Sequence, residues 1–161
     1  MRNFIKTTIE EFINEQVSIV NSIKEFIELD DKAIEDIVNR NKDFDEYQFD
    51  TAKTALLNLQ DVLKNNNTLT LYRVLSVNDV SDINTSNLGN HYTLSLDNLD
   101  DVTLYDIGID ETKKLYSVKV TSLIDNINLQ ETINAHVNYP FEQEVFLDNS
   151  DNIKILDIAP F

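Results

Sequence analysis

The spacing of apolar residues changes at residues 65–67, and this change constrains the possible fold more than any other feature. Before it, apolar residues recur at three- and four-residue steps, which places side chains on one face of a helix. After it, short runs of β-branched and aromatic residues predominate, as is typical of strands. This order predicts an α+β fold in which N-terminal helices pack on a mainly antiparallel β-sheet.

Helices are expected over most of residues 1–66. The first would carry a stripe formed by Ile5, Ile9, Phe12, Ile13, Val17, Val20, Ile23 and Ile27. A second, shorter helix is expected over 33–38, with Asp30 or Asp31 as its N-cap. A third should run from about Asp50 to the asparagines at 65–67, because Asn favours helix ends.

Strands are expected in the remainder of the chain. They cover residues 69–75, 115–120, 144–147 and 153–158, with a shorter strand over 91–96 that follows a loop at 81–90. The sequence contains no internal repeat. The helical part, 1–66, and the β-rich part, 67–161, are not separated by a Pro-rich or Gly/Ser-rich linker. We therefore expect a single domain over residues 1–161.

The chain is strongly acidic, with 29 acidic against 13 basic side chains and a formal net charge of −16. This charge excludes a generic nucleic-acid binder, since affinity for phosphates comes from clustered Lys and Arg. It also disfavours binding to an anionic membrane. A small anionic ligand held by a few basic groups remains possible, and most of the acidic side chains are expected on solvated helix faces.

Cysteine is absent from the sequence, which excludes disulfides, thiolate metal sites and a cysteine nucleophile. The histidines His91 and His136 are far apart, so no metal site is expected. We recognise neither a signal peptide nor a run of about 20 apolar residues that could span a membrane. The sequence therefore predicts a soluble, monomeric, cytoplasmic protein.

Arg73 and the strand at 91–95 carry the first candidate site residues. Arg73 lies within an apolar run, where it must point to solvent or serve a binding site, because an unpaired buried guanidinium is costly. Alternation along a strand would place His91, Thr93 and Ser95 on one face, although hydroxyls are also common on exposed sheets. Gly89, just before this strand, indicates a turn or the close approach of a ligand.

The segment at 139–147 carries the other candidates. Glu142 and Glu144 are two residues apart at the start of an expected strand, so they would face the same way and raise each other's proton affinity. Such a pair favours a site that needs carboxylates, or else it marks an exposed strand entrance.

Taken together, these segments resemble the mono-ADP-ribosyltransferases of the Arg–Ser–Glu class, which include clostridial binary toxins and phage-encoded transferases. The shared pattern is an arginine on the first strand, a hydroxyl-x-hydroxyl strand, and Glu-x-Glu before a Val-Phe-Leu strand. The resemblance covers residues 69–158 through its motifs. It implies an ADP-ribosyltransferase type of fold with NAD as substrate, bound in the β-rich part.

The resemblance also implies a role for each candidate residue. Glu144 would be the main catalytic carboxylate, and Glu142 would act on the acceptor. Arg73 would hold NAD, together with Thr93, Ser95 and a possible contact from His91. The remaining pair, Tyr139 and Phe141, would recognise the acceptor.

The implied reaction transfers ADP-ribose to an unidentified protein acceptor, at arginine, in the host cytoplasm if the chain is viral. NAD glycohydrolysis, with water as the acceptor, is a second interpretation. A third is a non-enzymatic acidic protein that mimics nucleic acid and occupies a basic site on its partner.

Overall fold

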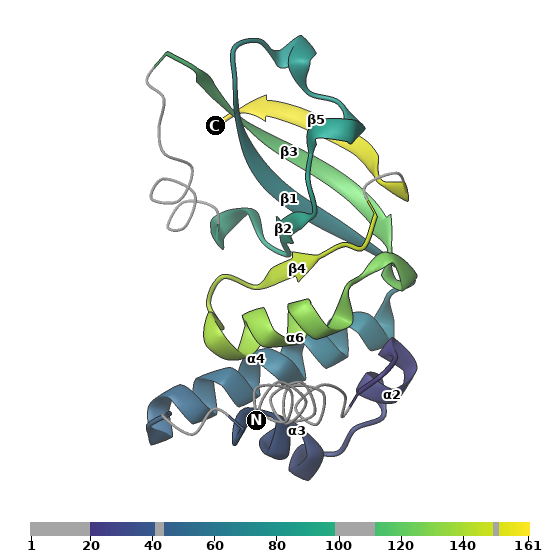
Figure 1. Ribbon diagram of the computed structural model, residues 1–161, viewed down its shortest axis with the longest axis vertical. Helices are drawn as coiled ribbons and strands as arrows, with labels where there is room; N and C mark the ends of the chain where they lie inside the picture. Colours follow the sequence, from purple (N-terminus) through teal and green to yellow (C-terminus); the bar gives the residue numbers. More distant parts are fainter. Residues whose placement is uncertain (1–19, 41–43, 99–111, 150–151) are drawn as a thin grey trace, which may run out of the picture.

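In the part of the chain that the structure describes, the sheet has five strands in the order β4-β2-β1-β3-β5, and every neighbouring pair is antiparallel. A computed structural model describes residues 20–40, 44–98, 112–149 and 152–161 (Figure 1). The strands are β1 Thr68–Val77, β2 His91–Thr93, β3 Lys114–Leu123, β4 Glu144–Phe146 and β5 Lys154–Pro160. The α+β class and the mainly antiparallel sheet are thereby confirmed.

The helices gather beside the edge strand β4, at the end of the molecule away from β3 and β5 (Figure 1). Those that lie in the described residues are α2 Ile23–Ile27, α3 Asp31–Val38, α4 Glu46–Asn65 and α6 Leu129–Asn138. Single 3-10 turns occupy Val80–Asp82, Thr85–Asn87, Leu96–Asn98 and Ile124–Asn126. The helix α6 packs between α4 and β4, and its Thr132 Oγ1 accepts a hydrogen bond from the Phe146 amide at 3.0 Å.

Side-chain caps fix where the helices begin. Of the two predicted N-cap candidates, it is Asp30 that caps α3, by accepting a hydrogen bond from the Ala33 amide at 2.9 Å. Asp45 caps α4 through a capping box. The Asp45 side chain accepts a hydrogen bond from the backbone N–H of Gln48, and the Gln48 side chain accepts one from the backbone N–H of Asp45. The third helix therefore begins before the predicted start at Asp50.

The prediction of a first helix that continues to Ile27 is wrong. Ser22 has an extended backbone, and its Oγ accepts a hydrogen bond from the Glu25 amide at 3.2 Å, so a new helix begins at Ile23. A serine in this position satisfies an amide that a helix start leaves without a partner. The apolar residues from Ile5 to Val17 lie outside the described residues.

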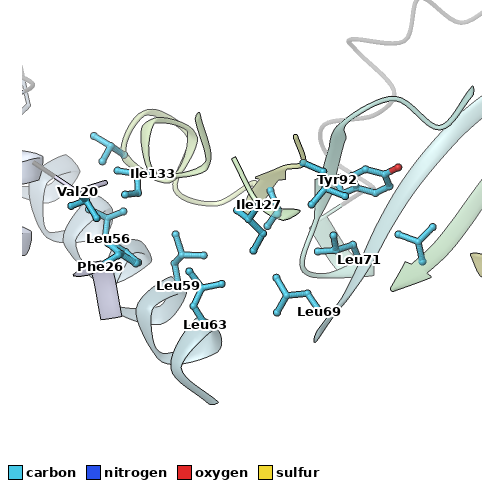
Figure 2. Close-up of a cluster of buried hydrophobic side chains, with 14 of the residues drawn as sticks. Val20, Phe26, Leu56, Leu59, Leu63, Leu69, Leu71, Tyr92, Ile127 and Ile133 are labelled. Atoms are coloured by element: carbon cyan, nitrogen blue, oxygen red, sulfur yellow. The ribbon is translucent and has the colours of Figure 1, made fainter. Parts of the chain in front are cut away.

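One hydrophobic core joins the helices to the sheet (Figure 2). Phe26, Leu56 and Leu59 contribute from the helices, while Leu71 and Tyr92 contribute from β1 and β2. Each of these five side chains is at most 3% exposed. Full burial of one large apolar side chain contributes about 1.5–3 kcal/mol, so this shared core holds the sheet and the helices in a fixed relation.

Candidate functional site

Strand register places the predicted hydroxyl and carboxylate side by side. Thr93 of β2 lies opposite Glu144 of β4 on one side and Tyr72 of β1 on the other. The same row continues through Lys119 of β3 to Asp157 of β5. Directly paired residues of an antiparallel sheet share a face, so all five side chains project from the same face. We call this set the cross-strand row.

Within the row, Thr93 also binds the segment that precedes β4. Its side chain is nearly buried, at 5% exposure, and its Oγ1 donates a hydrogen bond to the Glu142 carbonyl oxygen at 2.8 Å. Glu144 is half-buried. On the far side of Tyr72, the Lys119 Nζ lies 6.0 Å from the centroid of the Tyr72 ring. The row thus holds a carboxylate beside a hydroxyl, with a cation further along the same face.

Arg73 projects from the opposite face, because it follows Tyr72 in the strand. Its guanidinium carbon lies 6.0 Å from the centroid of the buried Tyr92 ring, and its Nη1 donates to the His91 carbonyl oxygen at 2.8 Å. Burial lowers the pKa of Arg73 from its ordinary value, although a guanidinium stays charged at neutral pH. The structure therefore does not bring Arg73 together with Glu144.

At Gly89, where the sequence predicts a turn or the close approach of a ligand, the group that comes close is the Arg73 side chain. Gly89 has a φ of +68°, and a Cβ at this position would lie 3.0 Å from the Arg73 Nη1. The His91 side chain is exposed, and its ring packs 4.2 Å from that of Phe146, its partner on β4. Partial burial, with the positive charge of Arg73 as a second cause, lowers the pKa of His91. The turn before β2 is thus built around Arg73.

Two expectations based on strand alternation do not hold. The strand β2 ends at Thr93, so Ser95 does not continue the strand face of His91 and Thr93. The Ser95 backbone N–H donates to the Thr93 Oγ1 at 3.4 Å, and the Ser95 Oγ accepts from the Asp97 backbone N–H at 3.3 Å. Gln143 has a φ of +48°, so the chain from Glu142 to Glu144 is not extended. Alternation therefore does not determine the relative directions of the two carboxylates.

Tyr139 and Phe141 contribute to an aromatic groove. They are 60% and 67% exposed, and Tyr47 of α4, at 70%, joins them around a groove of about 430 Å³. Asp45 and Glu142 also line it, and no basic residue does so among the described residues. Exposed aromatic residues gathered in one acidic groove are typical of an interaction surface.

His136 is a buried polar residue that the sequence analysis did not place in a site. It lies on α6 with 1% exposure, and its Nδ1 contacts the Thr132 carbonyl oxygen at 2.9 Å. A carbonyl can only accept, so Nδ1 carries the hydrogen. Burial lowers the pKa of His136, and the bond to Thr132 opposes this effect in part. The signal that could have found it is the spacing of Thr132, Ile133, His136 and Val137, which is helical.

The lowered pKa of His136 predicts that acid destabilises the fold. The unfolded chain, with a histidine pKa near the ordinary 6.5, binds a proton before the folded chain does, so stability falls as pH decreases below this value. Between about pH 7 and pH 5, His136→Gln should flatten this dependence, which cannot exceed about 1.4 kcal/mol per pH unit for one group. Urea unfolding of the wild-type chain and of His136→Gln at several pH values measures this dependence. An unchanged slope in His136→Gln would contradict the prediction.

The described residues contain no group of three or more side chains that could hold a metal ion. Of the helices that the structure describes, none has the length and apolar character needed to cross a membrane. In comparisons with known proteins, no family model matched the chain, and neither the curated proteins nor the solved structures gave a significant match.

Proposed function

We propose that this chain is an NAD-dependent mono-ADP-ribosyltransferase that modifies arginine on a protein acceptor. The observation that carries the proposal is the pairing of Glu144 with Thr93, whose hydroxyl binds the main chain of Glu142. The Glu-x-Glu segment and the hydroxyl-bearing strand, distant in sequence, thus lie on adjacent strands. This adjacency is what the resemblance to the Arg–Ser–Glu class requires of the chain.

The proposed reaction breaks the bond between the nicotinamide nitrogen and the ribose C1′. Nicotinamide leaves with the bonding electron pair, and positive charge develops on the ribose as in glycoside cleavage. The Glu144 carboxylate stabilises that charge as it forms. A guanidinium nitrogen of the acceptor then bonds to C1′, and its proton passes to Glu142 acting as general base. Since Glu142 also lines the aromatic groove, the acceptor would dock there, against Tyr139 and Phe141.

The NAD pyrophosphate needs a cation, and two candidates lie on opposite faces. Arg73 has a buried Nε without a hydrogen-bond partner among the described residues, which fits an anion ligand, but its face is not that of Glu144. Lys119 lies on the Glu144 face, in the cross-strand row. We therefore expect Lys119 to contact the pyrophosphate, while Arg73 holds the turn before β2.

Lys119→Met and Arg73→Met separate these roles. Loss of a charge-assisted contact of about 1.5–3 kcal/mol should raise the KM for NAD about 10- to 100-fold in Lys119→Met. Arg73→Met should leave the KM within about twofold and instead lower the free energy of unfolding, because the bond to the His91 carbonyl is lost. Steady-state kinetics and urea unfolding measure the two effects. A raised KM for NAD in Arg73→Met together with an unchanged KM in Lys119→Met would contradict this assignment and would show that Arg73 binds NAD.

Incubation of the chain with NAD labelled in its adenylate part, together with agmatine as a guanidine acceptor, tests the proposed activity. Labelled ADP-ribosyl-agmatine is the expected product. Free ADP-ribose alone would instead indicate NAD glycohydrolysis, in which water takes the place of the acceptor at the same site. Intact NAD with every acceptor tried would overturn both enzymatic functions.

The aromatic groove favours a second candidate function, that of a non-enzymatic module that binds a basic protein segment. Tyr47, Tyr139 and Phe141 can hold a Lys or Arg side chain by cation–π contact, and the net charge of −16 attracts a basic partner. Two results would favour this function: calorimetry shows no binding of NAD to the chain, and the chain binds a basic protein with an affinity that falls as salt is added.

A further inference from the structure

A second pocket, of about 400 Å³, lies between α4, the start of β1 and the end of α6. Its volume is within the range of small-molecule sites. None of the described residues that line it is charged, although charged residues make up 26% of the chain. A pocket without charges in so acidic a protein favours an uncharged ligand, since a phosphate or carboxylate would find no cation there.

His136 gives this pocket a fixed hydrogen-bond acceptor. The ring lines the pocket, and because Nδ1 donates to the Thr132 carbonyl, the neutral ring presents a lone pair on Nε2. No described residue forms a hydrogen bond with Nε2. Burial, which lowers the pKa of His136, keeps the ring neutral at pH 7. A ligand that reaches Nε2 must therefore donate an N–H or O–H.

The other lining residues fit a flat ring with hydrogen-bonding edges. Leu59, Val62 and Leu94 supply apolar contact area, while the amides of Asn58 and Gln143 each offer both a donor and an acceptor. The backbone of Gln143 is held in place, because its main-chain carbonyl oxygen accepts a hydrogen bond from the backbone N–H of Leu94 at 3.2 Å. A flat apolar body with donors and acceptors at its edges describes a nucleobase.

We propose that this pocket binds an uncharged nucleoside, with the base inserted toward the Nε2 of His136. None of the residues that line the pocket belongs to the cross-strand row. The inference therefore does not rest on NAD cleavage, and it can hold or fail independently of the proposed enzymatic activity.

Titration of the full chain with adenosine and with uridine, followed by amide NMR, tests the pocket. At least one nucleoside should shift the amides of Leu69, Leu94 and Gln143 saturably, with a Kd of about 0.1–1 mM, equivalent to roughly 4–5.5 kcal/mol. AMP should bind at least about fivefold more weakly than adenosine because its phosphate finds no cation. Equal binding of AMP, or no saturable shift with either nucleoside, would overturn the proposal.

A matched pair of variants on α4 locates the binding. Asn58 and Thr54 are both exposed on this helix, but only Asn58 lines the pocket. Asn58→Trp should fill the pocket and abolish the shifts, whereas Thr54→Trp should keep the wild-type Kd. Undiminished binding by a folded Asn58→Trp would place the nucleoside elsewhere and contradict the assignment. His136→Phe, checked for folding by its amide spectrum, should weaken binding at least about tenfold by removing the acceptor.

Discussion

Glu144→Gln should lower the turnover of NAD by about 10²–10³ while the KM for NAD stays within about twofold. Glutamine keeps the size and hydrogen-bonding capacity of the side chain but removes its negative charge. That charge is needed only as positive charge develops on the ribose, so the transition state is affected more than the bound substrate. The rate of nicotinamide release at several NAD concentrations gives both constants.

Asp157→Asn is the matched control for this variant. Asp157 lies in the same cross-strand row and projects from the same face, but it is on β5, at the opposite edge of the sheet from Glu144. The same loss of one negative charge should leave turnover at the wild-type level there. Full turnover by Glu144→Gln, or an equal loss in both variants, would contradict the assignment of Glu144.

Leu59→Ala should lower the free energy of unfolding by about 2–5 kcal/mol, because it removes a buried side chain and leaves a cavity. Leu59 is 1% exposed and belongs to the core that joins α4 to the sheet. With one shared core, the helices and the sheet should unfold together in a single transition. The helices report through far-ultraviolet circular dichroism. In a background in which Tyr47, Tyr105 and Tyr139 are replaced by Phe, tyrosine fluorescence reports on the sheet, where Tyr72, Tyr92 and Tyr116 lie and no Trp interferes.

Leu156→Ala is the control, since Leu156 on β5 is 46% exposed. It should lower the free energy of unfolding by less than Leu59→Ala does, because a half-exposed side chain loses less buried apolar area when it is truncated. Urea transitions that differ between the two probes would show that helices and sheet unfold separately, which would contradict a single domain.

The longer strands could be predicted because their side chains favour strands throughout. The runs expected at 69–75 and 115–120 lie within β1 and β3, which pair along their full lengths. The strand expected at 91–96 ends early, because the Thr93 hydroxyl accepts the Ser95 amide and turns the chain. Such competition between a hydroxyl and the strand ladder is local, but its outcome depends on packing that the sequence does not display.

The helix α6 went unpredicted because polar residues such as Gln130, Glu131 and Asn134 interrupt its apolar pattern. Its N-cap, Asn128, accepts a hydrogen bond from the Glu131 amide at 3.1 Å, and this signal was present in the sequence. The omission matters because α6 fills the space between α4 and β4 and carries His136.

The candidate site shows a different limit of sequence reasoning. Arg73, Thr93 and Glu144 lie on adjacent strands, but the face from which each side chain projects depends on register. A shift of one residue reverses that face. The connection between Arg73 and Thr93 includes two 3-10 turns and the glycine at 89, and no local pattern fixes the register across it.

A crystal structure of the Glu144→Gln variant with NAD would test the central claim most directly, since slow turnover should preserve the substrate. We predict that the nicotinamide ribose lies within hydrogen-bond distance of residue 144, on the face shared with Thr93, and that the pyrophosphate lies against Lys119. NAD bound on the Arg73 face, or no NAD in the crystal at saturating concentration, would contradict the account.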